Sequence, residues 1–169
     1  MTDSVKFIGK KSKVKEVGSA WVIESPRTLM HYHAYGELTP YFKALTEGKL
    51  MGTRCTNPGC PISKGKGEIF IPPRADCPDC HAKMEWVQMP NPVKGTIYSY
   101  TRVERGGTGL EISTPYYQID VMLEGLCTIP KGYLVNAKEA PKIGQKVKAF
   151  FRKGKSASNT CLDVYWKLI

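Results

Sequence analysis

The sequence of 169 residues lacks the features that mark a membrane protein, an exported protein or a self-sufficient enzyme. No apolar run approaches the roughly 18 residues that a membrane-spanning helix requires. The first residues, Met1 to Lys6, do not form the apolar core of a signal peptide, which leads us to expect a cytoplasmic protein. No nucleophile elbow occurs, and the glycine-rich stretch 104–114 does not continue as a phosphate loop. We therefore expect no catalytic residues in this chain.

Acidic residues are also missing from two stretches of a chain whose net charge is +10. Residues 6–15 contain five lysines and no acid, and residues 142–155 contain six basic residues and no acid. Basic stretches of this kind bind nucleic acids, anionic cofactors or acidic protein surfaces, although the N-terminal one can also be merely solvated. The second stretch overlaps a predicted strand, 145–152, in which side chains alternate between two faces. We expect Lys146, Lys148 and Arg152 to share its outer face.

Two closely spaced pairs of cysteines are the most informative motif. The first pair is Cys55 and Cys60, and sixteen residues later the second pair, Cys77 and Cys80, follows. Two such pairs with a short connector are typical of a tetrahedral four-thiolate metal site. Four thiolates suit one zinc ion best, with iron as the minority option. Because protein would fill every coordination position, we expect a structural site.

Three other interpretations of these cysteines compete with the metal site. Disulfides require an oxidising compartment, which the expected cytoplasmic location does not offer. A thioredoxin-like pair would begin a helix, whereas the residues after Cys80 look extended. The run from Cys77 to His81 matches the attachment motif of c-type haem, but this would leave Cys55 and Cys60 without a role. His81 is interpreted as a turn residue, and Cys127 and Cys161 as packing residues in strands.

The remaining pattern predicts a mainly β protein with a short helix near its N-terminus. Residues 1–37 form an arm with a short strand near 19–24. Residues 38–50 form an amphipathic helix, with Pro40 in its first turn and an apolar stripe that includes Tyr41, Phe42 and Leu45. Residues 51–90 form a zinc ribbon with two further short strands, which is too small to fold without its metal. Trp21 and the helix stripe are candidates for docking on a partner.

Residues 91–169 predict a five-stranded barrel of the OB type. Alternating apolar residues and glycine bends place strand segments one after another. Six segments carry this pattern, one more than the five strands of the barrel, and they are 96–103, 117–124, 126–129, 132–135, 145–152 and 160–168.

The order of motifs resembles a known family. The relevant stretches are Gly52-Thr-Arg-Cys55, Phe70-Ile-Pro-Pro-Arg74, Cys77-Pro-Asp-Cys80, Lys94-Gly-Thr-Ile-Tyr-Ser-Tyr100 and Ile143-Gly-Gln-Lys-Val147. Together they resemble acyl-CoA-associated proteins that carry a rubredoxin-like zinc ribbon followed by an OB-fold. The likeness covers roughly residues 38–153. This sequence departs from the family in placing four residues between Cys55 and Cys60, where two are common, and in a longer loop at 62–67.

The resemblance implies a non-catalytic subunit that partners an enzyme of the thiolase fold. Settings of the family include acetoacetyl-CoA thiolase working with hydroxymethylglutaryl-CoA synthase, acylphloroglucinol acyltransferase, a steroid side-chain aldolase and benzoylsuccinyl-CoA thiolase. It implies a hetero-oligomer of the α2β2 kind that acts on an acyl-CoA, with the coenzyme A moiety at a shared site. Candidate contacts to coenzyme A or to the partner are Lys146, Lys148, Arg152, Lys153 and Lys155.

The residues alone also permit a single-stranded nucleic-acid-binding protein. A zinc ribbon, an OB barrel and a basic charge are common in that class, and the aromatic residues Tyr98, Tyr100, Tyr116 and Phe150 could stack on bases. The resemblance makes the acyl-CoA hypothesis the favoured one.

Overall fold

The computed structural model describes residues 13–24, 32, 34–106 and 112–169. The chain divides into two compact units, residues 1–34 and residues 35–169. The first three lysines of the basic stretch 6–15 lie outside the described residues. Among the helices that the structure describes, none is long and apolar enough to cross a membrane.

The first unit contains a β-hairpin. Strands β1 (Lys13–Val17) and β2 (Ala20–Glu24) pair antiparallel around a turn in which Gly18 has a φ of 62°. The strand predicted near residues 19–24 is therefore confirmed. The hairpin exposes several large apolar side chains, namely those of Val14, Val17, Trp21, Val22 and Ile23. An isolated two-stranded hairpin is at best marginally stable in water, so these side chains need a surface on which to pack.

The second unit begins with the predicted helix. A short 3-10 turn, η1 (Gly36–Leu38), leads into α1 (Thr39–Glu47). Pro40 lies in the first turn, and Gly48 ends the helix in the left-handed region with a φ of 80°, where glycine has no steric penalty. The helix is confirmed but is shorter than the predicted range 38–50.

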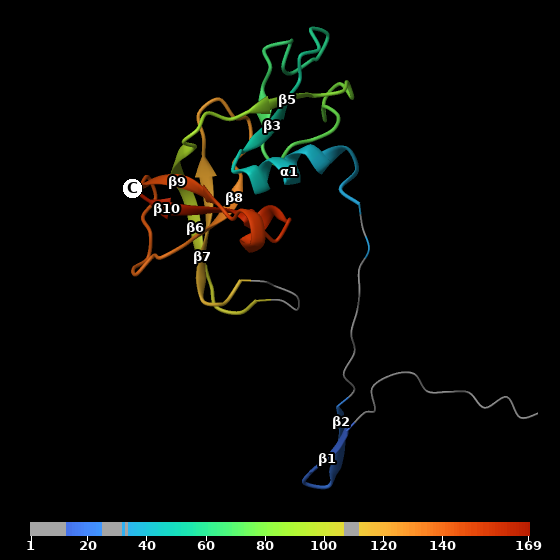
Figure 1. The fold of residues 1–169 in the computed structure, drawn as a ribbon, viewed down its shortest axis with the longest axis vertical. Helices are drawn as coiled ribbons and strands as arrows, with labels where there is room; N and C mark the ends of the chain where they lie inside the picture. Colours follow the sequence, from blue (N-terminus) through green and yellow to red (C-terminus); the bar gives the residue numbers. More distant parts are fainter. Residues whose placement is uncertain (1–12, 25–31, 33, 107–111) are drawn as a thin grey trace, which may run out of the picture. The chain divides into compact units, whose positions relative to one another are not determined.

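Three short strands form the ribbon that carries the cysteine pairs. Strand β3 (Met51–Arg54) lies between β4 (Ile69–Phe70) and β5 (Glu85–Gln88), and both pairings are antiparallel. Figure 1 shows the ribbon directly following α1, with the cysteine-bearing loops at its far end from the barrel. Because Thr53 of β3 pairs with both neighbouring strands, one end of each of the three strands lies at the same end of the sheet.

Five strands close into a barrel in the order β10-β8-β7-β6-β9. Neighbours pair antiparallel except β8 and β10, which are parallel. This arrangement is that of an OB-fold, and the predicted fold class is confirmed. The strands are β6 (Lys94–Val103), β7 (Tyr116–Met122), β8 (Lys131–Leu134), β9 (Lys146–Phe151) and β10 (Val164–Leu168).

One continuous apolar core joins the barrel, the ribbon and the helix. The barrel contributes fully buried Ile97, Ile119, Val121 and Val147, and the same cluster includes Leu45 of α1. The ribbon contributes Ile71 and Met89, and Leu50 joins them from just before β3. The ribbon that carries the cysteine pairs is therefore packed against the barrel rather than joined to it by a linker alone. The division of the chain at residues 38, 51 and 91 stays a prediction.

The loop between β7 and β8 forms hydrogen bonds that link the barrel to the ribbon. The strand predicted at 126–129 is wrong, because these residues form turns and a single bridge from Leu126 to Ile69. The hydroxyl of Thr128 accepts from the N–H of Ile71 and donates to its carbonyl oxygen, at 3.0 and 2.8 Å. Local hydrogen bonds to the ribbon thus replace a strand ladder.

The expectation that Cys127 and Cys161 are packing residues in strands is also wrong. Both side chains are exposed. Cys127 lies in the loop that contacts β4, where its N–H bonds to the carbonyl oxygen of Ile69, and Cys161 begins the 3-10 turn η3 (Cys161–Asp163) before β10. A second 3-10 turn, η2 (Gly154–Ser156), follows β9.

Candidate metal centre

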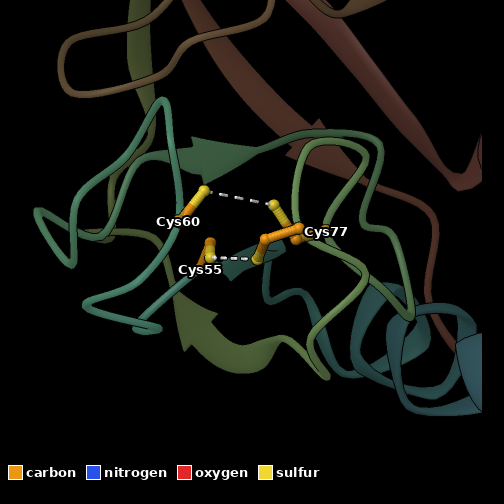
Figure 2. Close-up of side chains that lie close together, drawn as sticks. Cys55, Cys60 and Cys77 are labelled. Atoms are coloured by element: carbon orange, nitrogen blue, oxygen red, sulfur yellow. Dashed lines mark hydrogen bonds between the residues drawn. The ribbon is translucent and has the colours of Figure 1, made fainter.

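Two loops at the open edge of the ribbon bring the four paired cysteines together. Cys55 directly follows β3, and Cys60 lies further along the same loop, while Cys77 and Cys80 precede β5. Figure 2 shows the sulfur atoms of the two loops pointing toward one another. The strand pairing of β3 with β4 and β5 therefore sets the positions from which both loops approach.

The spacing of the sulfur atoms fits a tetrahedral metal ion. All four Sγ atoms lie within 4.8 Å of one another. The Sγ atom of Cys55 is 3.7 Å from that of Cys80, and the Sγ atom of Cys60 is 3.9 Å from that of Cys77. Zinc–sulfur bonds of about 2.3 Å in a tetrahedron place the sulfurs about 3.8 Å apart, whereas a disulfide would join them at about 2.0 Å. All four cysteines are free thiols, and their donor set suits zinc.

Burial and hydrogen bonds divide the thiols into two kinds. The hydroxyl of Ser63, helped by the N–H groups of Ile62 and Ser63, lowers the pKa of Cys60 to about 6, although burial opposes this. Burial raises the pKa of Cys77 to about 11, against the N–H groups of its loop. Thiolates held this close repel one another, and a bound divalent cation removes the repulsion. The close spacing of the four sulfur atoms therefore favours binding of a divalent cation.

The four cysteines leave no ligand position for substrate. Three of them are buried and Cys80 is half-buried, and tetrahedral zinc accepts four ligands. When bound, the ion would hold the two loops together in a small ribbon. Around the sulfurs, the buried side chains are those of Phe70 and Met84, which form too small a core to hold the loops by themselves.

His81 has the turn role that the sequence predicted. Its φ is 58°, and its N–H bonds to the carbonyl oxygen of Cys77 at 2.9 Å. The residue therefore closes the second cysteine loop, and the ligand cluster consists of the four cysteines.

The predicted basic contacts separate into three groups. Lys146 and Lys148 share the outer face of β9, while Val147 and Ala149 are buried, as the alternation predicted. The guanidinium of Arg152 lies 5.8 Å from the centre of the Tyr133 ring. Lys153 is elsewhere, against Gly48 at the end of α1, and Lys155 lies in η2.

Strand pairing reveals two further lysines that sequence reasoning missed. Lys94 of β6 and Lys167 of β10 both lie directly opposite Lys148. We call Lys94, Lys148 and Lys167 the lysine row. The ammonium groups of Lys148 and Lys167 lie 5.4 and 4.8 Å from the centre of the Phe150 ring. In the described part of the chain no member of the row has an ion-pair partner. Like charges directly opposite are unfavourable, so the row favours an anionic ligand or partner.

Two of the four predicted docking residues are buried inside their own unit. Tyr41 and Leu45 are 5% and 0% exposed because α1 packs on the core of its own unit. Phe42 is half-buried and stacks on Tyr35, with ring centres 3.6 Å apart. Trp21 is 72% exposed on the hairpin and remains a candidate for docking.

Comparisons with known proteins identify relatives of this architecture. No model of a known protein family matches the chain. A protein of Methanocaldococcus jannaschii described as a DUF35 domain-containing scaffold protein is 34% identical over 117 residues, which is 69% of this chain and 77% of that protein.

Two solved structures share the fold. A structure described as an Ltp2-ChsH2(DUF35) aldolase matches with a TM-score of 0.58 and 19% identity, covering 82% of this chain and 97% of that one. A DUF35 protein of unknown function from Sulfolobus solfataricus matches with a TM-score of 0.54 and 22% identity, covering 79% and 87%.

Proposed function

Because the chain belongs to the DUF35 family, we propose that it is a non-catalytic, zinc-binding subunit of a thiolase-fold enzyme complex that acts on an acyl-CoA. The observation that carries the proposal is the cysteine cluster, whose four sulfur atoms lie within 4.8 Å of one another and would fill every coordination position of a tetrahedral ion. Such a centre shapes a surface and leaves no coordination position for chemistry. The scaffold description of the relative supports the same role.

The proposed partner is a catalytic subunit of the thiolase fold, in a hetero-oligomer of the α2β2 kind. One structural neighbour is described as an aldolase with a DUF35 component, which supports assembly with an enzyme. In this proposal the catalytic subunit supplies the chemistry, namely thiolytic cleavage or condensation of a β-ketoacyl-CoA, with aromatic ones such as benzoylsuccinyl-CoA among the candidates. This chain supplies a docking face and part of the coenzyme A region.

The outer face of β9 and its neighbours is the proposed contact with coenzyme A phosphates or an acidic patch of the partner. Beside the lysine row, Phe150 and Tyr165 stack with ring centres 5.8 Å apart. A surface groove of about 450 Å³ adjoins them, lined in part by Tyr133, Arg152 and Lys167. Ammonium and guanidinium groups form charge-assisted hydrogen bonds with phosphate groups, which supports this surface as the contact with coenzyme A.

The barrel surface disfavours the nucleic-acid alternative. OB-folds bind oligonucleotides on the face of their second and third strands, which are β7 and β8 here. On that face, Lys131 bonds to Asp120 at 3.0 Å. Hydrogen bonds from Ser99 and Lys131 keep the pKa of Asp120 below its usual range, so the carboxylate is ionised and offsets the lysine. The lysine row lies instead on β6, β9 and β10.

Reversing the charge of Lys146, Lys148 and Arg152 to glutamate separates the two functions. We expect the triple variant to lose at least about 10-fold in activity or in assembly of the enzyme complex, because each charge-assisted contact contributes about 1.5–3 kcal/mol. The measurement is the activity of the co-expressed complex at several coenzyme A concentrations. A charge-matched control reverses Lys43, Lys66 and Lys138, which are exposed on other surfaces.

Oligonucleotide binding by the free wild-type chain tests the nucleic-acid alternative. At about 0.15 M salt it should bind single-stranded oligonucleotides weakly, with an affinity that falls steeply as salt increases. Nanomolar binding, with Tyr98→Ala or Tyr100→Ala costing about 1–3 kcal/mol each, would show that the ligand is a nucleic acid.

A further inference from the structure

The side chain of Ser63 is buried beside the metal centre without an evident structural role. It is 2% exposed, and its hydroxyl has no hydrogen-bond partner of good geometry within the described residues. Buried hydroxyl groups are nearly always paired, so an unpaired one requires an explanation. Sequence reasoning did not select this residue, because serine in a loop is ordinary.

The loop that contains Ser63 repeats the backbone of the second cysteine loop. Residues 60–64 and residues 77–81 both begin with Cys-Pro. In each loop the N–H of the fifth residue bonds to the carbonyl oxygen of the first, at 3.0 and 2.9 Å. The fifth residue is left-handed in both, with φ values of 46° and 58°. Position 63 in the first loop therefore corresponds to position 80 in the second, which is occupied by Cys80.

This correspondence directs the side chain of Ser63 toward the cysteine cluster. Cys80 reaches the cluster from the fourth position of its loop, with its sulfur 3.7 Å from that of Cys55. Ser63 occupies the same place in the first loop, and Cys55 supplies the fourth sulfur from the end of β3.

We propose that Ser63 is a positioning residue of the metal centre, whose hydroxyl donates a hydrogen bond to the thiolate pair of Cys55 and Cys60. Position 63 is at the same time a latent ligand position, at which a cysteine can replace Cys55. The inference rests on the proposed metal binding at the four cysteines and adds to it a residue that none of the ligand spacings reveals. It explains how residues 60–64 help to bind a metal although they contain one cysteine where residues 77–81 contain two.

Removing the hydroxyl should loosen the metal. Partners of metal ligands typically contribute 10–100-fold to metal affinity, so we expect Ser63→Ala to release zinc to an excess of chelator about 10-fold faster than the wild type. The measurement uses the full chain loaded with zinc and a colorimetric chelator. Ser99→Ala is the matched control, because it removes a serine hydroxyl that bonds to Asp120 in the barrel.

Moving the ligand tests the latent position. Cys55→Ser should lose the four-sulfur absorption spectrum of bound Co²⁺, and Cys55→Ser with Ser63→Cys should restore it, because both loops then have the spacing Cys-Pro-x-Cys. Cys55→Ser with Thr56→Cys is the control, since Thr56 is exposed next to the lost ligand and should not restore the spectrum.

The outcomes separate this inference from the metal centre itself. A wild-type chain that binds neither zinc nor Co²⁺ would refute the metal centre and with it the role of Ser63. If the wild type binds metal, release at the wild-type rate from Ser63→Ala would overturn the positioning role alone. Failure of the double variant to regain the four-sulfur spectrum, with circular dichroism showing a folded barrel, would overturn the latent ligand position.

Discussion

Replacing Cys77 with serine should remove the metal and unfold the ribbon. Structural zinc sites contribute about 10–16 kcal/mol of apparent binding free energy, which is comparable to the roughly 5–15 kcal/mol that typically stabilises a whole domain. Cys77 is 1% exposed at the centre of the cluster. We expect metal content to fall from about one zinc per chain to nearly none, and amide signals of residues 51–90 to collapse in NMR spectra. Cys55→Ser, Cys60→Ser and Cys80→Ser should behave alike.

Cys161→Ser is the matched control, because Cys161 is exposed and lies outside the cluster. It should retain the metal and the spectrum. A wild-type chain that is folded without zinc or iron, or that shows a haem absorption band, would contradict the metal assignment.

Trp21→Ala should weaken assembly with the catalytic partner. Trp21 is 72% exposed on a hairpin whose other apolar side chains are exposed as well, and an isolated hairpin gains little stability by itself. Tryptophans that anchor interfaces typically contribute about 2–4 kcal/mol, so we expect the dissociation constant to rise by about 30-fold or more. The measurement is a titration of the labelled chain with the purified catalytic subunit.

Val22→Ala distinguishes the two faces of the hairpin. Neighbouring residues of a strand point to opposite faces, and Val22 is 44% exposed. If the face that carries Trp21 docks, Val22→Ala should leave the dissociation constant within about threefold, or about 0.7 kcal/mol. Equal, small effects of both variants would remove the hairpin from the interface.

The sequence predicts features that depend on short spacings. The cysteine pairs, the helix that Gly48 ends and the alternation in β9 each involve residues close together in the chain, and the structure agrees with all three. The strand expected at 126–129 failed because its hydrogen bonds go to Ile71 and Ile69 of the ribbon. Local periodicity carries no information about such distant partners.

Which side chains are buried, and which charged side chains cluster on the surface, could be learned only from the three-dimensional structure. An amphipathic helix shows that one face is covered, but not whether its own domain or a partner covers it, and Tyr41 and Leu45 proved to belong to the core. The lysine row depends on which strands pair, since Lys94 and Lys167 are far from Lys148 in sequence. Ser63 had a signal that could have been found, because Cys-Pro begins both loops.

Co-purification of the full chain from its native source tests the central claim, that the protein is an accessory subunit of a thiolase-fold enzyme. Affinity purification under mild salt, followed by mass spectrometry and analytical ultracentrifugation, shows which protein accompanies it and in what ratio. We predict a partner of about 40 kDa, the size of two fused thiolase-fold halves, in a stable complex that buries more than about 2,000 Å² and converts an acyl-CoA. A soluble, monodisperse monomer that recovers no such partner and ignores purified thiolase-fold enzymes would contradict the account.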